Sequence, residues 1–208
     1  FTWCGQSCGS TSRLLVHESL HGRFVEALAA SLPKRHKPGL ATHMSTTMGA
    51  LVDQAQYERS RSYIDIAIQE GARIVAGGKR PADLAKGYFL EATVLDGVQP
   101  SHRVAQEEIF GPVLSVLSWK DEAEMLSIAN GVDYGLTASV WTQDLVTAHR
   151  TATQLQAGYV WINDCSIHLT GAPFGGYKLS GVGREECLQE LHEFTQIKNI
   201  NVALRKRG

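Results

Sequence analysis

Short runs of apolar and β-branched residues alternate along the chain with segments of helical periodicity. Strands are predicted where such runs are bounded by turn residues, at 13–17, 73–76, 88–95, 113–119, 136–141 and 159–163. Helices are predicted between them, at 20–32, 50–69, 121–130 and 144–156, with Pro33 as the stop of the first and Asp121 as the cap of the third. Strands that alternate with helices form parallel sheets, so the pattern predicts an α/β fold with a mostly parallel sheet flanked by helices.

Two of the predicted helices carry apolar residues that we expect to face the sheet. In the first, a large apolar residue recurs every four positions, at Leu20, Phe24, Leu28 and Leu32. In the second, the expected buried positions are Leu51, Ala55, Ile64, Ala67 and Ile68. Each set gives its helix one face to bury.

The end of the chain has a different pattern. Residues 164–183 are predicted to form a loop, followed by a short helix in which Cys187 faces the core. The run from Phe194 to Leu204 then carries apolar residues that suit a strand at a sheet edge or between subunits, because an exposed apolar edge invites pairing. The chain therefore divides into residues 1–192 and a C-terminal oligomerisation strand with its tail, 193–208.

Composition and charge narrow the class of partner. Among 208 residues, 20 Lys and Arg stand against 21 Asp and Glu, so no broad basic field exists for nucleic acid or a membrane surface, and a small molecule is the expected partner. The one basic cluster, Arg205-Lys206-Arg207, is interpreted as a solvated end.

Four cysteines form no disulfide framework, no apolar run approaches the roughly 20 residues that span a bilayer, and no signal peptide is recognised; a cytoplasmic protein is expected. Because Phe1 follows no Met and the apolar pattern begins at once, we expect a segment of a larger protein.

The first candidate for chemistry is Cys8, which lies between Gly5 and Gly9 just before a predicted strand. A tight turn there would expose a thiolate nucleophile and point backbone N–H groups at an oxyanion. The alternative is a small buried residue in a turn. A second alternative is a zinc site of Cys4, Cys8, His17 and His21, but its middle spacer is shorter than the usual ~12 residues. We therefore expect no metal.

Two further segments are candidates for binding. Between Glu107 and Pro112, Glu108 could accept hydrogen bonds from a ribose diol and Phe110 could pack against a flat heterocycle, unless they are a solvated acid and a core ring. In the glycine-rich loop that follows residue 171, Phe174 and the upstream His168 would line a cavity, the alternative being a core ring and a surface histidine. No G-x-G-x-x-G phosphate loop follows any predicted strand.

These segments, in this order, resemble one family. Gly5-Gln6-Ser7-Cys8 resembles the G-Q-x-C nucleophile motif of aldehyde dehydrogenases, and Glu107 to Pro112 resembles their E-x-F-G-P motif. Pro173 to Gly181 is similar to their P-F-G-G-x-K-x-S-G motif, while Tyr134 to Leu136 and Ala157 to Asn163 are similar to further family segments. The similarity extends over the whole chain.

The resemblance implies the thiol-bearing catalytic domain of an NAD- or NADP-dependent aldehyde dehydrogenase. Cys8 would attack the aldehyde, its backbone N–H and an upstream amide would hold the oxyanion, and water would hydrolyse the thioester left after hydride transfer. Glu108 would bind the nicotinamide ribose and Phe110 would pack beside the ring. Phe174 and His168 would line the aldehyde tunnel. A homodimer or homotetramer is expected.

Other details also follow from the resemblance. Gln56 and Arg59 match positions that touch the cofactor in some members, and Trp3 replaces a family Asn. The family's dinucleotide-binding domain, general base and oxyanion amide all precede Cys8, so the segment alone is expected to be inactive. Two other functions stay open: a cofactor-independent thiol esterase or acyl transferase, and a non-catalytic structural module of the same fold.

Overall fold

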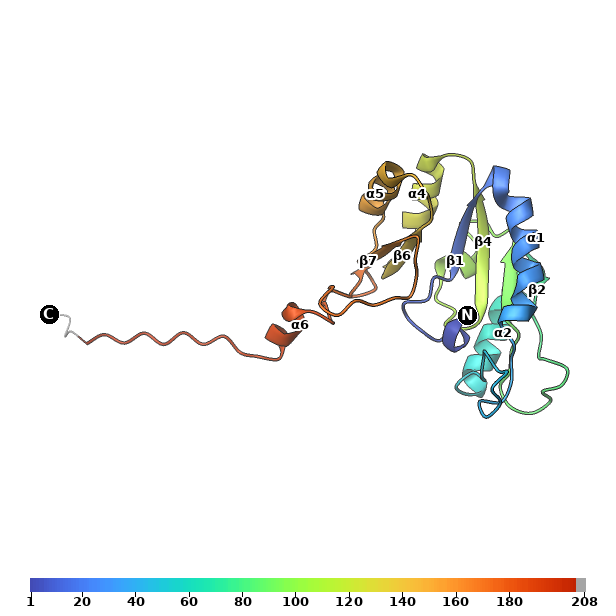
Figure 1. Ribbon diagram of the computed structural model, residues 1–208, viewed down its shortest axis with the longest axis horizontal. Helices are drawn as coiled ribbons and strands as arrows, with labels where there is room; N and C mark the ends of the chain where they lie inside the picture. Colours follow the sequence, from blue (N-terminus) through green and yellow to red (C-terminus); the bar gives the residue numbers. More distant parts are fainter. Residues whose placement is uncertain (205–208) are drawn as a thin grey trace.

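A four-stranded sheet lies at the centre of the computed structural model, which describes residues 1–204 (Figure 1). Its strand order is β1 (Arg13–His17), β4 (Val113–Trp119), β3 (Thr93–Asp96) and β2 (Arg73–Ala76). β4 is parallel to both β1 and β3, and only β2 is antiparallel to its neighbour. The predicted α/β fold with a mostly parallel sheet is therefore confirmed. The basic cluster at 205–207 lies outside the described residues.

The two middle strands of this sheet form the core. Val94, Leu95, Val116 and Leu117 are 0–1% exposed, as expected for strands covered by protein on both faces. Only the last part of the predicted strand 88–95 belongs to the sheet. The residues before it pair with loops instead, since Tyr88 accepts a hydrogen bond from the N–H of Leu51 and Glu91 donates one to Lys79.

Helix α1 (Glu18–Arg35) is longer than predicted and packs along a different face. The stop expected at Pro33 is wrong, because the helix continues through it to Arg35. Leu32 is buried, but Leu20 and Phe24 are 51% and 45% exposed. Four residues advance about 400° around a helix, which is 40° more than a full turn. Over the three steps from Leu20 to Leu32 the apolar row therefore rotates by about 120°, so its two ends cannot both face the sheet.

Helix α2 (Gln54–Gln69) begins later than predicted, because the side chain of Asp53 caps it by accepting from the N–H of Gln56 at 2.8 Å. Of the expected buried positions, Ile64 and Ala67 are buried within the helix and Leu51 is buried before it, but Ala55 and Ile68 are exposed. The buried face is completed by Tyr57, Ser60 and Tyr63. A short helix α3 (Arg103–Gln106), which was not predicted, packs near α2.

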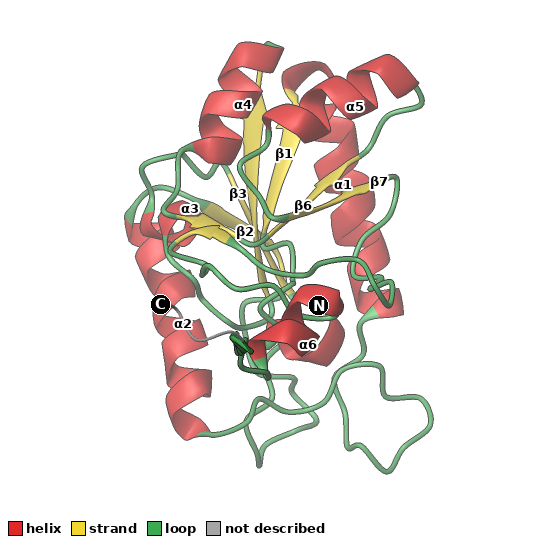
Figure 2. Ribbon diagram, turned by 90° about the vertical axis from the view of Figure 1, so that its left-hand side faces the viewer, coloured by secondary structure: helices red, strands yellow, loops and turns green. Residues whose placement is uncertain are grey.

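The second half of the chain adds two short strand pairs and the helices α4 (Glu122–Asn130) and α5 (Leu145–Gln154), which are labelled in Figure 2. Strands β6 (Thr137–Val140) and β7 (Tyr159–Ile162) are parallel. Helix α4 is capped by Asp121, as predicted. Helix α5 is capped by Asp144. A further antiparallel pair consists of β5 (Tyr134–Gly135) and β8 (Tyr177–Lys178), the latter within a predicted loop.

The last described segment leaves the rest of the chain. Helix α6 (Leu188–Glu193) has no buried residue, and Cys187 is its half-buried N-cap instead of a core residue within it. Residues 194–204 form no strand and are exposed throughout, and Figure 1 shows them running away from the other elements. The strand expected at Phe194 to Leu204 is therefore not formed, because no strand of residues 1–204 pairs with this segment. No helix in residues 1–204 is long and apolar enough to span a membrane.

Candidate active site

An unusual turn lies shortly before Cys8 in the chain. The short helix η1 (Thr2–Gly5) has three consecutive residues with positive φ, Trp3 at 52°, Cys4 at 60° and Gly5 at 70°. Two of these residues are not glycine, so the backbone is strained, a feature that recurs at functional sites. Cys8 follows as an exposed residue, and within residues 1–204 its backbone N–H donates no hydrogen bond. Both its thiol and its N–H are thus available to a ligand.

The four thiols differ in their surroundings. Cys4 is 4% exposed and donates through Sγ to the carbonyl of Gly49 at 3.2 Å, and burial raises the pKa of this thiol. Cys187 is half-buried, whereas Cys165 is exposed on the loop after β7. Exposure alone therefore does not distinguish Cys8 from Cys165.

A close backbone contact joins the Cys8 turn to the loop that carries Glu108. A Cβ at Gly5 would lie 2.1 Å from the carbonyl oxygen of Gly111, so only glycine fits there. A Cβ at Gly111 would in turn lie 2.2 Å from the hydroxyl of Ser60 on α2. The turn, the loop and the helix are therefore stacked in contact, which brings two motifs far apart in sequence to one place.

The two glutamates of this loop have different environments. The carboxylate of Glu107 accepts two hydrogen bonds from Arg103, at 2.6 and 2.9 Å, and one from the hydroxyl of Tyr63 at 2.7 Å. Arg103 and then Tyr63 lower the pKa of Glu107 to about 2. Glu108 is exposed, and its carboxylate has no hydrogen-bond partner within residues 1–204. Of the two, Glu108 is the carboxylate that can accept a ligand's hydroxyl groups.

Gln56 and Arg59 hold the backbone of the same loop. Gln56 donates through Nε2 to the carbonyls of Phe110 and Ile109 at 2.6 and 3.1 Å, and Arg59 donates through Nη2 to that of Glu108 at 2.5 Å. These bonds fix Phe110 at a φ of 58° with its ring 38% exposed. The resemblance suggested that Gln56 and Arg59 contact the cofactor. It did not predict their hydrogen bonds to the loop backbone, and the spacing of the two residues on the helix gave no sign of them.

His168 and Phe174 meet beside the Cys8 turn. A Cβ at Gly9 would lie 3.9 Å from Nε2 of His168 and 3.9 Å from Cζ of Phe174. Their ring centroids are 4.5 Å apart, and both pack against Tyr159. Phe174 is 4% exposed, so it packs beneath His168 as a buried ring. His168 is partly exposed and is the one of the two that a ligand can contact.

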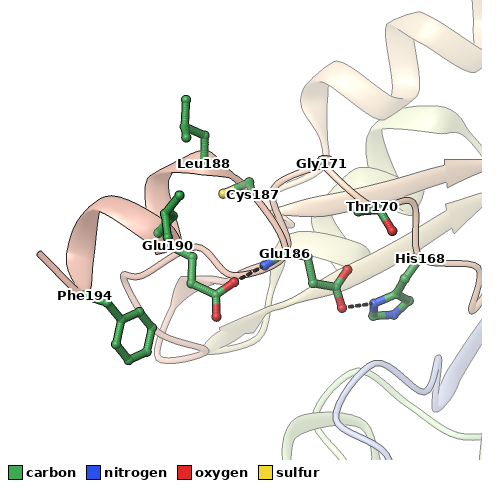
Figure 3. A pocket seen from close by; sticks show the side chains of 9 residues that line it. His168, Thr170, Gly171, Glu186, Cys187, Leu188, Glu190 and Phe194 are labelled. Atoms are coloured by element: carbon green, nitrogen blue, oxygen red, sulfur yellow. Dashed lines mark hydrogen bonds and ion pairs between the residues drawn. The ribbon is translucent and has the colours of Figure 1, made fainter.

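A wide hollow of about 820 Å³ lies between the loop of His168 and α6 (Figure 3). Its wall includes Glu186, Cys187, Leu191 and Phe194, but not Cys8. Helix α6 has no buried residue, so the hollow beside it is open to solvent. Because Cys8 does not line this hollow, it is not the candidate reactive site.

The residues suggested for zinc are engaged elsewhere. His17 bonds to the carbonyl of Lys120 at 3.0 Å and His21 bonds to Asp96 at 2.7 Å, while Cys4 bonds to Gly49. No group of three or more metal-ligating side chains gathers anywhere in residues 1–204. The geometry favours a thiol site over a metal site.

Comparisons with known proteins agree with this geometry. The profile of the aldehyde dehydrogenase family matches residues 1–200. The aldehyde dehydrogenase tropH of Talaromyces stipitatus is 47% identical over 98% of this chain and 41% of its own length. An acetaldehyde dehydrogenase of Pseudomonas aeruginosa is 45% identical over 96% of this chain and 40% of its own. The crystal structure of a betaine aldehyde dehydrogenase from Staphylococcus aureus, in complex with NAD⁺, superposes with a TM-score of 0.89 at 40% identity, over 92% of this chain and 38% of that one. The chain thus spans about two fifths of the length of the relatives it matches.

Proposed function

Because this chain belongs to the aldehyde dehydrogenase family, we propose that it is the C-terminal, thiol-bearing part of an NAD(P)-dependent aldehyde dehydrogenase. Cys8 is the nucleophile, Glu108 and Phe110 bind the nicotinamide end of the cofactor, and His168 and Phe174 border the aldehyde site. The observation that carries the proposal is the contact of Gly5 with Gly111, because it joins the thiol turn to the loop of Glu108 and Phe110.

Each residue has a defined part in this reaction. The Cys8 thiolate forms a bond to the carbonyl carbon, and the oxygen takes up the electron pair and accepts a hydrogen bond from the Cys8 N–H. NAD or NADP, when bound, supplies the hydride acceptor. Water then attacks the thioester carbon and Cys8 leaves as a thiolate.

The surroundings of Glu108 and Phe110 suit the cofactor. An exposed carboxylate that accepts no hydrogen bond within residues 1–204 can accept hydrogen bonds from both hydroxyls of a ribose, and an exposed ring beside it can cover one face of a nicotinamide. Glu107 cannot serve in this way, because Arg103 and Tyr63 occupy its oxygens.

Exchange of Glu108 for Gln tests this assignment in the longer polypeptide. We expect kcat for aldehyde oxidation to fall about tenfold or more, since a charge-assisted hydrogen bond contributes ~1.5–3 kcal/mol. Hydrolysis of an activated ester through Cys8 should change little, because it needs no cofactor ring. Both rates are measured on the same preparation, by NADH absorbance and by ester cleavage.

The matched control is Glu107→Gln, which changes the same functional group one residue away. It should weaken the loop's link to Arg103 and lower both rates together. Equal losses in both rates for Glu108→Gln would instead favour a folding role for Glu108 and a cofactor-independent thiol esterase or a structural module.

The C-terminal run supports a proposal about assembly. Ile197 and Leu204 are 103% and 94% exposed, and such apolar residues gain most by pairing with a second subunit. We propose that 193–208 comprises an oligomerisation strand, Phe194 to Leu204, and its tail, and that this strand pairs with a second subunit in a homodimer or homotetramer. Truncation after His192 should yield monomers when mass is measured in solution. A dimer that survives the truncation would contradict the proposal.

A cytoplasmic location completes the proposal. All four cysteines are free thiols, which suits a reducing compartment and a nucleophilic Cys8. The near-neutral charge balance, with 20 basic and 21 acidic residues, suits a small aldehyde as partner better than nucleic acid or a membrane surface.

A further inference from the structure

Glu186, whose side chain pairs with His168, is held by hydrogen bonds of both its side chain and its backbone. Its Oε1 lies 2.8 Å from Nδ1 of His168, as the dashed line in Figure 3 shows. Its carbonyl accepts from the N–H of Gly171 at 2.9 Å, and its own N–H donates to Glu190 at 2.6 Å. Glu186 also has a φ of 64°, a conformation that is costly for a side chain of this kind. Several contacts therefore converge to hold this carboxylate against His168.

The pair determines which nitrogen of His168 carries a proton. A carboxylate accepts hydrogen bonds and donates none, so Nδ1 of the neutral ring must be the donor. Nε2 is then left as the nitrogen that can accept a hydrogen bond. It lies 3.9 Å from the position that a Cβ would take at Gly9, the residue that follows Cys8 in the sequence.

Neighbouring rings keep His168 from turning over. Its ring is stacked on Tyr159 at an interplanar angle of 19° and a centroid distance of 5.7 Å, and it packs against Phe174 at 4.5 Å. A flip would remove the bond to Glu186. The orientation of the accepting nitrogen toward the Cys8 turn is therefore set by Glu186 together with these two rings.

We infer that Glu186 is a positioning residue that presents Nε2 of His168 as an acceptor beside Cys8, and that the site selects aldehydes carrying a hydroxyl group. The inference rests on the proposed function. A hydroxyl can donate to Nε2, whereas an alkyl group of the same size cannot. A quaternary ammonium group has no proton to donate either, so it gains nothing from this nitrogen.

Kinetics with two isosteric substrates test the selectivity in the longer polypeptide. We expect kcat/KM to be about two- to twelvefold higher for 3-hydroxybenzaldehyde than for 3-methylbenzaldehyde, the range that one net hydrogen bond of ~0.5–1.5 kcal/mol gives. The difference should appear in KM, because the bond is present in the bound substrate as well as during reaction.

Three variants separate positioning from structure. Glu186→Asn keeps a residue that tolerates positive φ but is too short to reach His168, so the preference should fall to about one. Glu186→Gln should retain the preference, because its amide oxygen still accepts from Nδ1. His168→Phe keeps the ring stacking and should lose the preference. A merely structural role would slow both substrates equally in Glu186→Asn and leave their ratio unchanged, which would overturn the inference.

The nitrogen chemical shifts of the His168 ring give a readout that needs no activity. In the original protein they should report the form protonated at Nδ1, and in Glu186→Asn they should move toward the form protonated at Nε2. Unchanged shifts in that variant would overturn the positioning role. If no aldehyde is oxidised at all, the proposed function and the substrate preference fail together, while the shifts still decide the role of Glu186.

Discussion

Replacement of Cys8 by Ala should lower kcat for aldehyde oxidation by at least about 10⁴-fold in the longer polypeptide, the order of loss expected when a covalent nucleophile is removed. The thiol is exposed three residues after a strained turn, and its own N–H is unpaired within residues 1–204. Hydride cannot leave the aldehyde carbon until the carbonyl has been converted to a tetrahedral adduct, and Cys8 is the residue proposed to form that adduct. NADH absorbance measures the loss.

The matched control is Cys165→Ala, since Cys165 is the other exposed thiol. It should leave oxidation unchanged, and iodoacetamide should inactivate this variant as fast as the original protein. Cys4 should stay unlabelled in the folded protein because it is buried and its pKa is raised. A large loss of activity in Cys165→Ala together with full activity in Cys8→Ala would show that the nucleophile has been misassigned.

Local patterns predicted the central sheet well. The strands at Arg13–His17, Arg73–Ala76 and Val113–Trp119 are found with the predicted bounds, because each is a β-rich run limited by polar or turn residues. The cap predicted at Asp121 needs only its own helix and is likewise found, and the helix predicted from residue 144 is capped by Asp144. These elements depend on interactions within a few residues.

The errors have one local and one distant source. The drift of the apolar row on α1, which leaves Leu20 and Phe24 exposed, is local and follows from the four-residue spacing itself. The segment from Phe194 to Leu204 has the composition of a strand but no partner strand within residues 1–204. A strand needs hydrogen-bonding partners, which its own sequence cannot specify.

The site shows the same division. Cys8, Glu108 and Phe110 could be selected as candidates from their motifs. The hydrogen bonds that hold the segments around the candidate site could not be predicted in the same way. Arg59 on α2 contacts the Glu108 backbone, and Glu186 contacts His168, only because the fold brings those segments together. Neither contact follows a spacing rule. Nor could the motifs show that Glu107 is occupied and Glu108 is available.

The contact between the two loops leads to the second large effect. Exchange of Gly5 for Ala should lower the free energy of unfolding by about 2–5 kcal/mol, combining the cost of a left-handed conformation, ~1–2 kcal/mol, with that of overpacking, ~1–3 kcal/mol. The φ of Gly5 is +70°, and the new Cβ would meet the carbonyl of Gly111 at 2.1 Å. Backbone cannot move aside as a flexible side chain can, so the turn and the loop must separate. Urea unfolding measures the loss.

The same change should act on catalysis through the distance between the two loops. Oxidation should fall more than ester hydrolysis, because only oxidation needs the loop of Glu108 and Phe110 to lie at the thiol. Gly22→Ala is the matched control, since a Cβ at Gly22 in α1 meets nothing within 4 Å and Ala favours a helix over Gly by up to about 1 kcal/mol. That variant should be at least as stable as the original and fully active. If Gly5→Ala proved equally stable and active, the contact between Gly5 and Gly111 could not be what brings the thiol to the cofactor loop, and the observation that carries the proposed function would be lost.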